Sequence, residues 1–195
     1  MTIFIGLDGE MTGNDIHAGA KLIQIGLTIR DDRGMQTYTQ TMNPGNVASG
    51  WQREAEQVHG ISQLDLEGAY TQWEVDKWTV EWLASRGATY QTRMKNVAVG
   101  FNVAGFDMPY VKQHLPKTFD LLSYRTVDLN AILFALTGVG KIGSSYEAWK
   151  KKAKAYAVEQ LASRGPAQEH NAGWDSAMHL YCFEYLQGVL KGLDK

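Results

Sequence analysis

The chain has 195 residues, of which 44% are hydrophobic and 11% aromatic, so it is long enough to bury one sizeable core and we expect a single domain over residues 1–195. Its net charge of −2 excludes an overall basic field of the kind that holds long duplex nucleic acid. The single cysteine excludes an internal disulfide and fits a cytoplasmic protein, and no stretch approaches the roughly 18 apolar residues of a membrane span.

The first half of the chain is expected to form strands followed by a helix. An apolar run at residues 3–7 is typical of a buried strand, and residues 22–29 alternate as a second strand. A turn at 31–34 leads into the return strand of a hairpin at 35–42. After a short helical patch at 52–58, apolar residues at three- and four-residue spacing predict an amphipathic helix over 72–86, with its tryptophans in the core.

The second half alternates strands with helices, which is typical of an α/β fold. We expect a short strand at 96–101, a helix from Asp107 to His114 that stops before Pro116, and another strand at 124–129. A helix at 129–136 follows. The pattern of Ser144 with Glu147 predicts the start of a further helix that reaches about residue 162, and a long helix covers roughly 171–190.

Two carboxylates follow the first strand one residue apart. Because side chains alternate along a strand, Asp8 and Glu10 are expected to lie on the same face at its carboxyl end, with Gly9 between them. Two buried anions at this separation favour a divalent cation, which would use both as oxygen ligands. A solvated strand end is the alternative.

Two further acidic residues lie at the ends of other predicted elements. Asp107 follows the strand at 96–101, and Asp175 lies in the early turns of the last helix. Since strand ends converge on one edge of an α/β sheet, four carboxylates are expected to meet there and to hold two cations for phosphodiester hydrolysis. His170 has a suitable ordinary pKa to take a proton from the attacking water.

Three segments also carry a family resemblance. DGEMTG (8–13), FNVAGFD (101–107) and HNAGWD (170–175) together resemble the DEDDh 3′→5′ exonucleases, in matching order and separation. The resemblance implies a ribonuclease-H-like mixed five-stranded sheet flanked by helices. It also implies Asp8, Glu10, Asp107 and Asp175 as ligands of two Mg²⁺ or Mn²⁺ ions, with His170 as the general base.

The resemblance further implies a substrate site. Met11, Thr12 and Gly13 would receive the terminal nucleotide, with Thr12 near its 3′-hydroxyl. His59 lies in a segment similar to one in proofreading members, and it either lines the nucleotide pocket or has a local turn role. Asn102 would order the loop ahead of Asp107. The position before it, often histidine in relatives, is Phe101 here, so a polar contact from that side chain is lost.

The resemblance implies a 3′→5′ exonuclease that acts on the 3′ end of a single strand. EMTG (10–13) is similar to the first motif of oligoribonucleases, whereas HGI (59–61) is similar to DNA-proofreading and trimming enzymes. We favour single-stranded DNA, because the near-neutral charge suits a footprint of a few nucleotides. Short RNA is the alternative, and a non-catalytic nucleic-acid-binding or polymerase-partner module is a third hypothesis.

Some features have two interpretations. The predicted helix that ends near residue 162 carries four lysines, Lys150, Lys151, Lys152 and Lys154. They form either a solvated helix face or a patch that guides phosphates beside the site. The apolar side of the final helix could face a partner chain or the core, so the oligomeric state stays open. The histidines outside the motifs are expected to be structural or exposed, and they are His17, His114 and His179.

Overall fold

The computed structural model describes residues 1–46, 48, 50–138, 145–164, 168 and 170–192. The first three strands form an antiparallel meander, which contains the predicted hairpin of the second and third strands. β1 (Ile3–Met11) pairs with β2 (Leu22–Asp31), and β2 pairs with β3 (Gly34–Asn43). None of the helices in these ranges has the length and apolar character that a bilayer span requires.

Three shorter strands complete a mixed sheet in the order β4-β3-β2-β1-β5-β6. β5 (Asn96–Gly100) runs parallel to β1, and β6 (Thr126–Asp128) runs parallel to β5. The α/β class and the flanking helices are confirmed. The sheet has six strands rather than five, because β4 (Tyr70–Thr71) adds a two-residue parallel pairing to the edge of β3, which is too short to leave an alternating pattern in the sequence.

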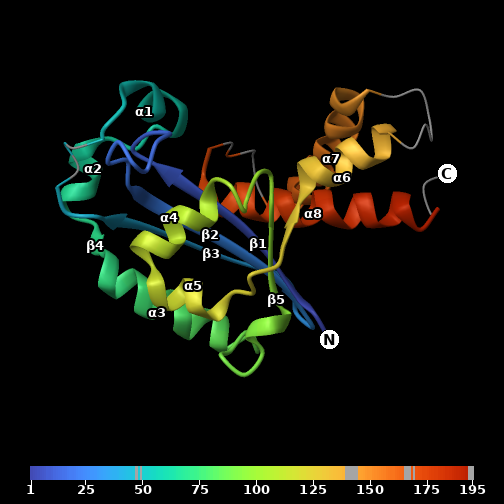
Figure 1. Cartoon of the computed structure of the whole chain (residues 1–195), viewed down its shortest axis with the longest axis horizontal. Helices are drawn as coiled ribbons and strands as arrows, with labels where there is room; N and C mark the ends of the chain where they lie inside the picture. Colours follow the sequence, from blue (N-terminus) through green and yellow to red (C-terminus); the bar gives the residue numbers. More distant parts are fainter. Residues whose placement is uncertain (47, 49, 139–144, 165–167, 169, 193–195) are drawn as a thin grey trace.

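One face of the sheet is covered by the long C-terminal helix α8 (Ala172–Leu190), which crosses β1 and β2 (Figure 1). Glycines allow this close approach: a Cβ added to Gly26 would lie 1.8 Å from the carbonyl oxygen of Ala172. The hydroxyl groups of Thr28 and Ser176 are 2.8 Å apart and join strand to helix. The register between α8 and the sheet is therefore fixed at the first turn of the helix, which contains Asp175.

Two further helices pack outside α8. They are α6 (Leu129–Gly138) and α7 (Tyr146–Leu161), which share a hydrophobic cluster with it. Residue 144, predicted to cap α7, lies outside the described residues. Ser145 caps the helix instead, and its hydroxyl accepts the N–H of Ala148 at 3.3 Å.

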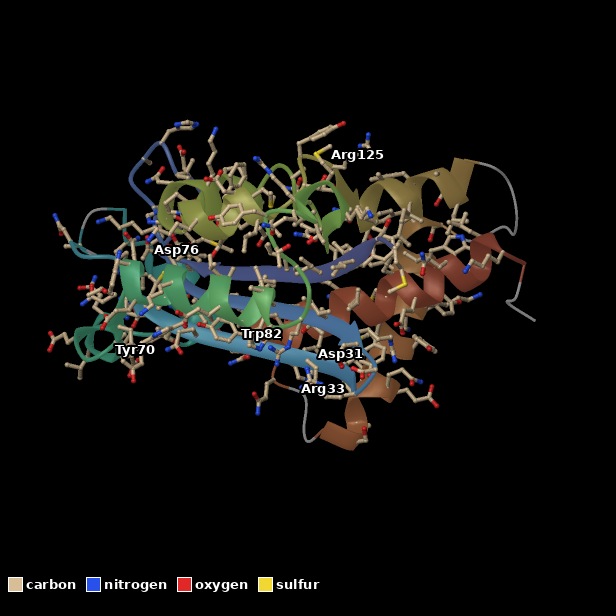
Figure 2. All side chains as sticks on the ribbon, turned by 90° about the horizontal axis from the view of Figure 1, so that it is seen from below. Asp31, Arg33, Tyr70, Asp76, Trp82 and Arg125 are labelled. Atoms are coloured by element: carbon tan, nitrogen blue, oxygen red, sulfur yellow. The ribbon has the colours of Figure 1, made fainter. Side chains whose placement is uncertain are left out.

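The opposite face of the sheet packs against α3 (Gln72–Ala84), with α4 (Asp107–His114) and α5 (Pro116–Leu121) beside it. Figure 2 shows Asp76 and Trp82 on α3, and the Trp82 ring lies 5.5 Å from that of Tyr38 on β3. The helix α5 was not predicted, since Pro116 suggested an end of helix. Proline is equally suited to the first helical position, because an N–H at that position would have no partner within the helix and its absence costs no hydrogen bond.

The remaining elements are short. They are α1 (Arg53–His59), α2 (Gln63–Glu67) and two 3₁₀ turns at Arg93–Lys95 and Ala162–Arg164. In Figure 1, α1 lies on one side of the upper end of β1, and α6 with α7 lies on the other.

Candidate active site

Two of the predicted carboxylates lie near the end of β1, on the face covered by α8. Phe4 and Gly6 contact α8 from the same strand, so the two-residue period places Asp8 and Glu10 on that side. The pairing of β1 with β5 ends at Gly6, so both carboxylates stand beyond the end of the neighbouring strand. This leaves room for the loop that follows β5.

Asp107 comes from that loop. It is the first residue of α4, its side chain is 3% exposed, and its Oδ1 accepts the N–H of Gly9 at 3.1 Å. The hydrogen bond attaches the start of α4 to the stretch between the other two carboxylates. Asp107 is therefore brought to the end of β1 from a position 98 residues later in the chain.

Asp175 completes the cluster from the first turn of α8. Asp8, Glu10 and Asp175 each offer a carboxylate oxygen within 4.8 Å of the others. The helix start is fixed by Asn171, whose side chain accepts two main-chain N–H groups and caps the helix. Its neighbour Ala172 donates its N–H to Gln24 of β2, which ties the helix start to the sheet.

The electrostatics of the cluster require a counter-charge. Burial, followed by repulsion from the neighbouring carboxylates, raises the pKa of Glu10 from 4.5 to about 8 and the pKa of Asp8 well above its ordinary value. Burial also raises the pKa of Asp107 to about 7, although hydrogen bonds from main-chain N–H groups oppose this. Oxygen ligands from several carboxylates suit a hard divalent cation, so the donor set fits Mg²⁺ or Mn²⁺.

His170 is held by its main chain. Its N–H donates to Asp175 Oδ2 at 2.9 Å, and its φ of 62° lies in the left-handed region. Among the residues that the structure describes, Asn102 (φ 56°) is the other non-glycine residue with positive φ, and both belong to the predicted motifs. Such backbone conformations cost free energy and cluster at functional sites. Burial lowers the pKa of His59, and the exposed His170 side chain is close enough to that imidazole to add a small effect in the same direction.

His179 lies closer to the site than the sequence suggested. It is buried, its Nδ1 donates to the carbonyl oxygen of Leu7 at 3.0 Å, and its Nε2 lies 3.8 Å from Asp8 Oδ1. Burial lowers the pKa of His179 to about 4, so the ring is neutral and turns an unprotonated nitrogen towards Asp8. The sequence held a signal for this: His179 follows Asp175 by four residues, which places both on one face of a helix.

A pocket of about 260 Å³ opens beside Glu10, between the end of β1, α1 and the start of α4. Two predicted substrate residues, Met11 and His59, line it, and the sequence did not single out Phe106, Asn14 or the α1 residues that line it too. His59 Nδ1 accepts the N–H of Ile61 at 3.0 Å, so the ring turns Nε2–H away from the turn. Ligand pockets usually measure about 300–1,000 Å³, so this one lies just below the usual size.

Three other predicted substrate residues do not line the pocket. Thr12 is fully buried, and its hydroxyl donates to the carbonyl of Gly50 and accepts the N–H of Lys21, so it joins the two loops that hold these residues. The carbonyl of Gly13 accepts the hydroxyl of Tyr110.

Asn102 is exposed, and its carbonyl accepts the N–H groups of Gly105 and Phe106. These bonds fold the loop that leads to Asp107.

Comparison with solved structures identifies the fold. Exonuclease I of E. coli, crystallised with single-stranded DNA and zinc, superposes with a TM-score of 0.65 at 14% identity, over 99% of this chain and 42% of that one. A 3′-exonuclease solved with a histone mRNA stem-loop gives 0.60 at 13% identity, over 98% and 83%. The nuclease domain of 3′hExo, a DEDDh family member bound to rAMP, gives 0.56 at 16% identity, over 98% and 93%.

The chain has the fold of the DEDDh 3′-exonucleases. It spans less than half the length of Exonuclease I. Comparisons with protein-family models and with curated proteins found no match. The exonuclease fold thus rests on structural similarity, and the residues that would carry its chemistry come from the geometry of this chain.

Proposed function

We propose that the chain is a divalent-metal-dependent 3′→5′ exonuclease that releases nucleoside 5′-monophosphates from single-stranded nucleic acid. The observation that supports this best is the convergence of Asp8, Glu10 and Asp175 within 4.8 Å, with Asp107 bonded to the same strand end. Three segments far apart in the sequence supply these groups. Such a cluster is unfavourable unless cations neutralise it, and a hydrolase that needs cations would account for it.

The proposed roles of the residues follow from their positions. Two cations held by Asp8, Glu10, Asp107 and Asp175 would supply the positive charge that activates a water and neutralises the scissile phosphate. His170, which is exposed and donates its N–H to Asp175, takes the proton from that water. The pocket beside Glu10 holds the terminal base, with His59 and Met11 against it. The buried His179 packs beside Asp8 and donates to the carbonyl of Leu7 on the same strand.

Single-stranded DNA is the substrate that we favour. A net charge of −2 favours a short footprint over contacts with a long duplex. Exonuclease I was crystallised with single-stranded DNA and 3′hExo with rAMP, so the fold accommodates both sugars. Short RNA is therefore the second candidate substrate. Matched DNA and RNA strands, from dinucleotides to about twenty nucleotides, separate the two, and strict preference for RNA dinucleotides would overturn our choice.

The activity is tested with a 5′-labelled single strand in Mg²⁺ or Mn²⁺, with products resolved by length. A ladder that shortens from the 3′ end is expected, and EDTA is expected to abolish it. Asp8→Ala and His170→Ala should each lose at least about a thousandfold in rate, because each removes a group from a site that acts as a unit. Wild-type hydrolysis that survives EDTA would exclude the mechanism.

A non-catalytic binding module is distinguished by the same variants. His170→Ala should lose hydrolysis yet keep the rise in melting temperature that Mn²⁺ causes, whereas Asp8→Ala should lose both. Glu67→Gln, an exposed carboxylate on α2, serves as the control and should change neither. If wild type shows no hydrolysis but keeps metal and strand binding, the module hypothesis is favoured.

A further inference from the structure

A row of aromatic rings and lysines runs along α7 next to the acidic cluster. Lys150 Nζ lies 5.5 Å from the centroid of the Phe101 ring and 5.7 Å from that of Tyr146. Lys154 Nζ lies 6.0 Å from the same Phe101 ring. Tyr146 stacks on Phe134 of α6, with centroids 4.5 Å apart and ring planes at 22°. We call these five residues the aromatic–lysine track.

One end of the track meets the acidic site. The Phe101 ring packs edge-on against His179 at 5.3 Å, and His179 Nε2 lies 3.8 Å from Asp8 Oδ1. Lys154 is also close enough to interact electrostatically with Asp8. Both lysines belong to one helix face, since they are four residues apart. The track therefore begins beside the carboxylates that would hold the scissile phosphate.

The other end of the track is open to solvent. Phe134 is 64% exposed, Lys154 is exposed, and Lys150, Tyr146 and Phe101 are half-buried. In Figure 1 the α6–α7 pair lies on the opposite side of the end of β1 from α1, which borders the base pocket. A single strand of nucleic acid whose 3′-terminal base occupies that pocket would cross the acidic cluster, and its upstream nucleotides would extend towards α7.

We propose that the aromatic–lysine track binds the nucleotides upstream of the 3′-terminal one. This deepens the proposed exonuclease function and rests on it. The two ammonium groups of Lys150 and Lys154 pair with successive backbone phosphates, and the exposed ring of Phe134, which is stacked on Tyr146, takes up a base by stacking. Alternating cations and aromatic faces are the features that hold single strands without regard to sequence.

The charge distribution favours a nucleic acid over an apolar partner. The chain carries slightly more acidic than basic residues, yet α7 places Lys154 close to Asp8 of the acidic cluster, with Lys150 one turn away over the Phe101 ring. A polyanion that continues past a cation-filled site meets positive charge there. If the lysines only cover the rings of α6 and α7 as packing, their loss should not change strand binding more than the loss of neighbouring lysines does.

Those neighbours provide a matched control. Lys151 and Lys152 are exposed on the same helix, and the ammonium group of Lys152 lies 5.0 Å from the Trp149 ring, away from Phe101. The variant Lys150→Gln/Lys154→Gln and the control Lys151→Gln/Lys152→Gln remove the same charge from the same helix. Lys150→Arg/Lys154→Arg should restore binding, because arginine keeps the charge and the ring contact.

Binding is measured first, without hydrolysis. A fluorescein-labelled phosphorothioate oligothymidylate of about twelve nucleotides is titrated in Ca²⁺ and followed by anisotropy. The Kd of the Lys150→Gln/Lys154→Gln variant should be about tenfold above that of the control, and the slope of log K against log salt should be about 1.4 smaller, from two lost phosphate contacts. Phe134→Ala should also weaken binding, about fivefold. Equal affinity of the two double variants would overturn the proposal.

Hydrolysis then separates the track from the exonuclease function. The Lys150→Gln/Lys154→Gln variant should lose about tenfold in kcat/KM on the twelve-nucleotide strand but much less on a dinucleotide, which has no backbone phosphate beyond the scissile one for the lysines to bind. Equal losses on both lengths would overturn the proposal. If wild type hydrolyses neither strand, the exonuclease function fails, and the binding measurement still decides whether the track exists.

Discussion

Replacement of one carboxylate in the cluster should stabilise the metal-free protein, most strongly at high pH. A carboxyl group whose pKa is raised by folding stabilises the native state only while it is protonated. For Glu10 the pKa rises from 4.5 to about 8, so this stability is fully present below pH 4.5 and is lost as the pH rises through about 8. Wild type without metal should therefore lose stability between these limits.

The size of the effect follows from the shift of Glu10. A rise in pKa from 4.5 to about 8 corresponds to about 5 kcal/mol, at about 1.4 kcal/mol per pH unit. Asp8 and Asp107 also have raised pKa values and share protons with it, so removal of one carboxylate relieves only part of the repulsion. We expect Glu10→Gln to gain about 2–3 kcal/mol near pH 9, or about 5–10 °C in melting temperature.

The assay is thermal unfolding in EDTA from about pH 5 to pH 9, with Glu67→Gln as the exposed control. The difference in melting temperature between Glu10→Gln and wild type should grow with pH. The melting temperature of the control should change with pH as that of wild type does. Addition of Mn²⁺ near pH 8 should reverse the order, because the metal stabilises only the complete ligand set. A difference that does not change with pH would refute the reasoning from repulsion within the cluster.

Three further variants test the framework around the site. Asp76→Ala should lower the free energy of unfolding in urea by about 2–4 kcal/mol, because the buried carboxylate accepts the N–H and hydroxyl of Thr118 at the start of α5. Asp76→Glu should not restore the wild-type free energy of unfolding, because its longer side chain displaces the carboxylate. Gly26→Ala places a Cβ 1.8 Å from the carbonyl of Ala172, so it should displace α8 and reduce the melting-temperature rise caused by Mn²⁺; an unchanged rise would contradict this. His179→Gln removes the ring that packs beside Asp8, so it should weaken Mn²⁺ binding at least about tenfold in calorimetry; native affinity would show that this packing does not position Asp8.

Much of the site is readable from local sequence patterns. The two-residue period of a strand was enough to place Asp8 and Glu10 on one face, and the structure confirms that they share it. The spacing of His170 and Asp175 matches a bond across a helix start, where the His170 N–H meets the Asp175 carboxylate. These relations lie within one element or its cap, so backbone geometry alone sets them.

Other relations arise between segments distant in the chain. The hydroxyl of Thr12 is buried because loops at Lys21 and Gly50 close over it, which no local pattern shows. For His179 the sequence likewise predicted only a structural or exposed histidine. The packing of α8 on β1 places it beside Asp8. Burial and pairing partners of such groups depend on the whole fold.

The sequence by itself determined the order of the longer strands and helices, the α/β class and the acidic residues that could hold metal, because periodicity and caps are local properties. Tertiary structure decided where these residues meet: the pairing of β5 with β1 ends at Gly6, which leaves the end of β1 open to Asp107. It also separated the four lysines of α7 by position: Lys150 and Lys154 lie over Phe101, whereas Lys152 lies over Trp149. Only the packing of α7 distinguishes the faces of that helix.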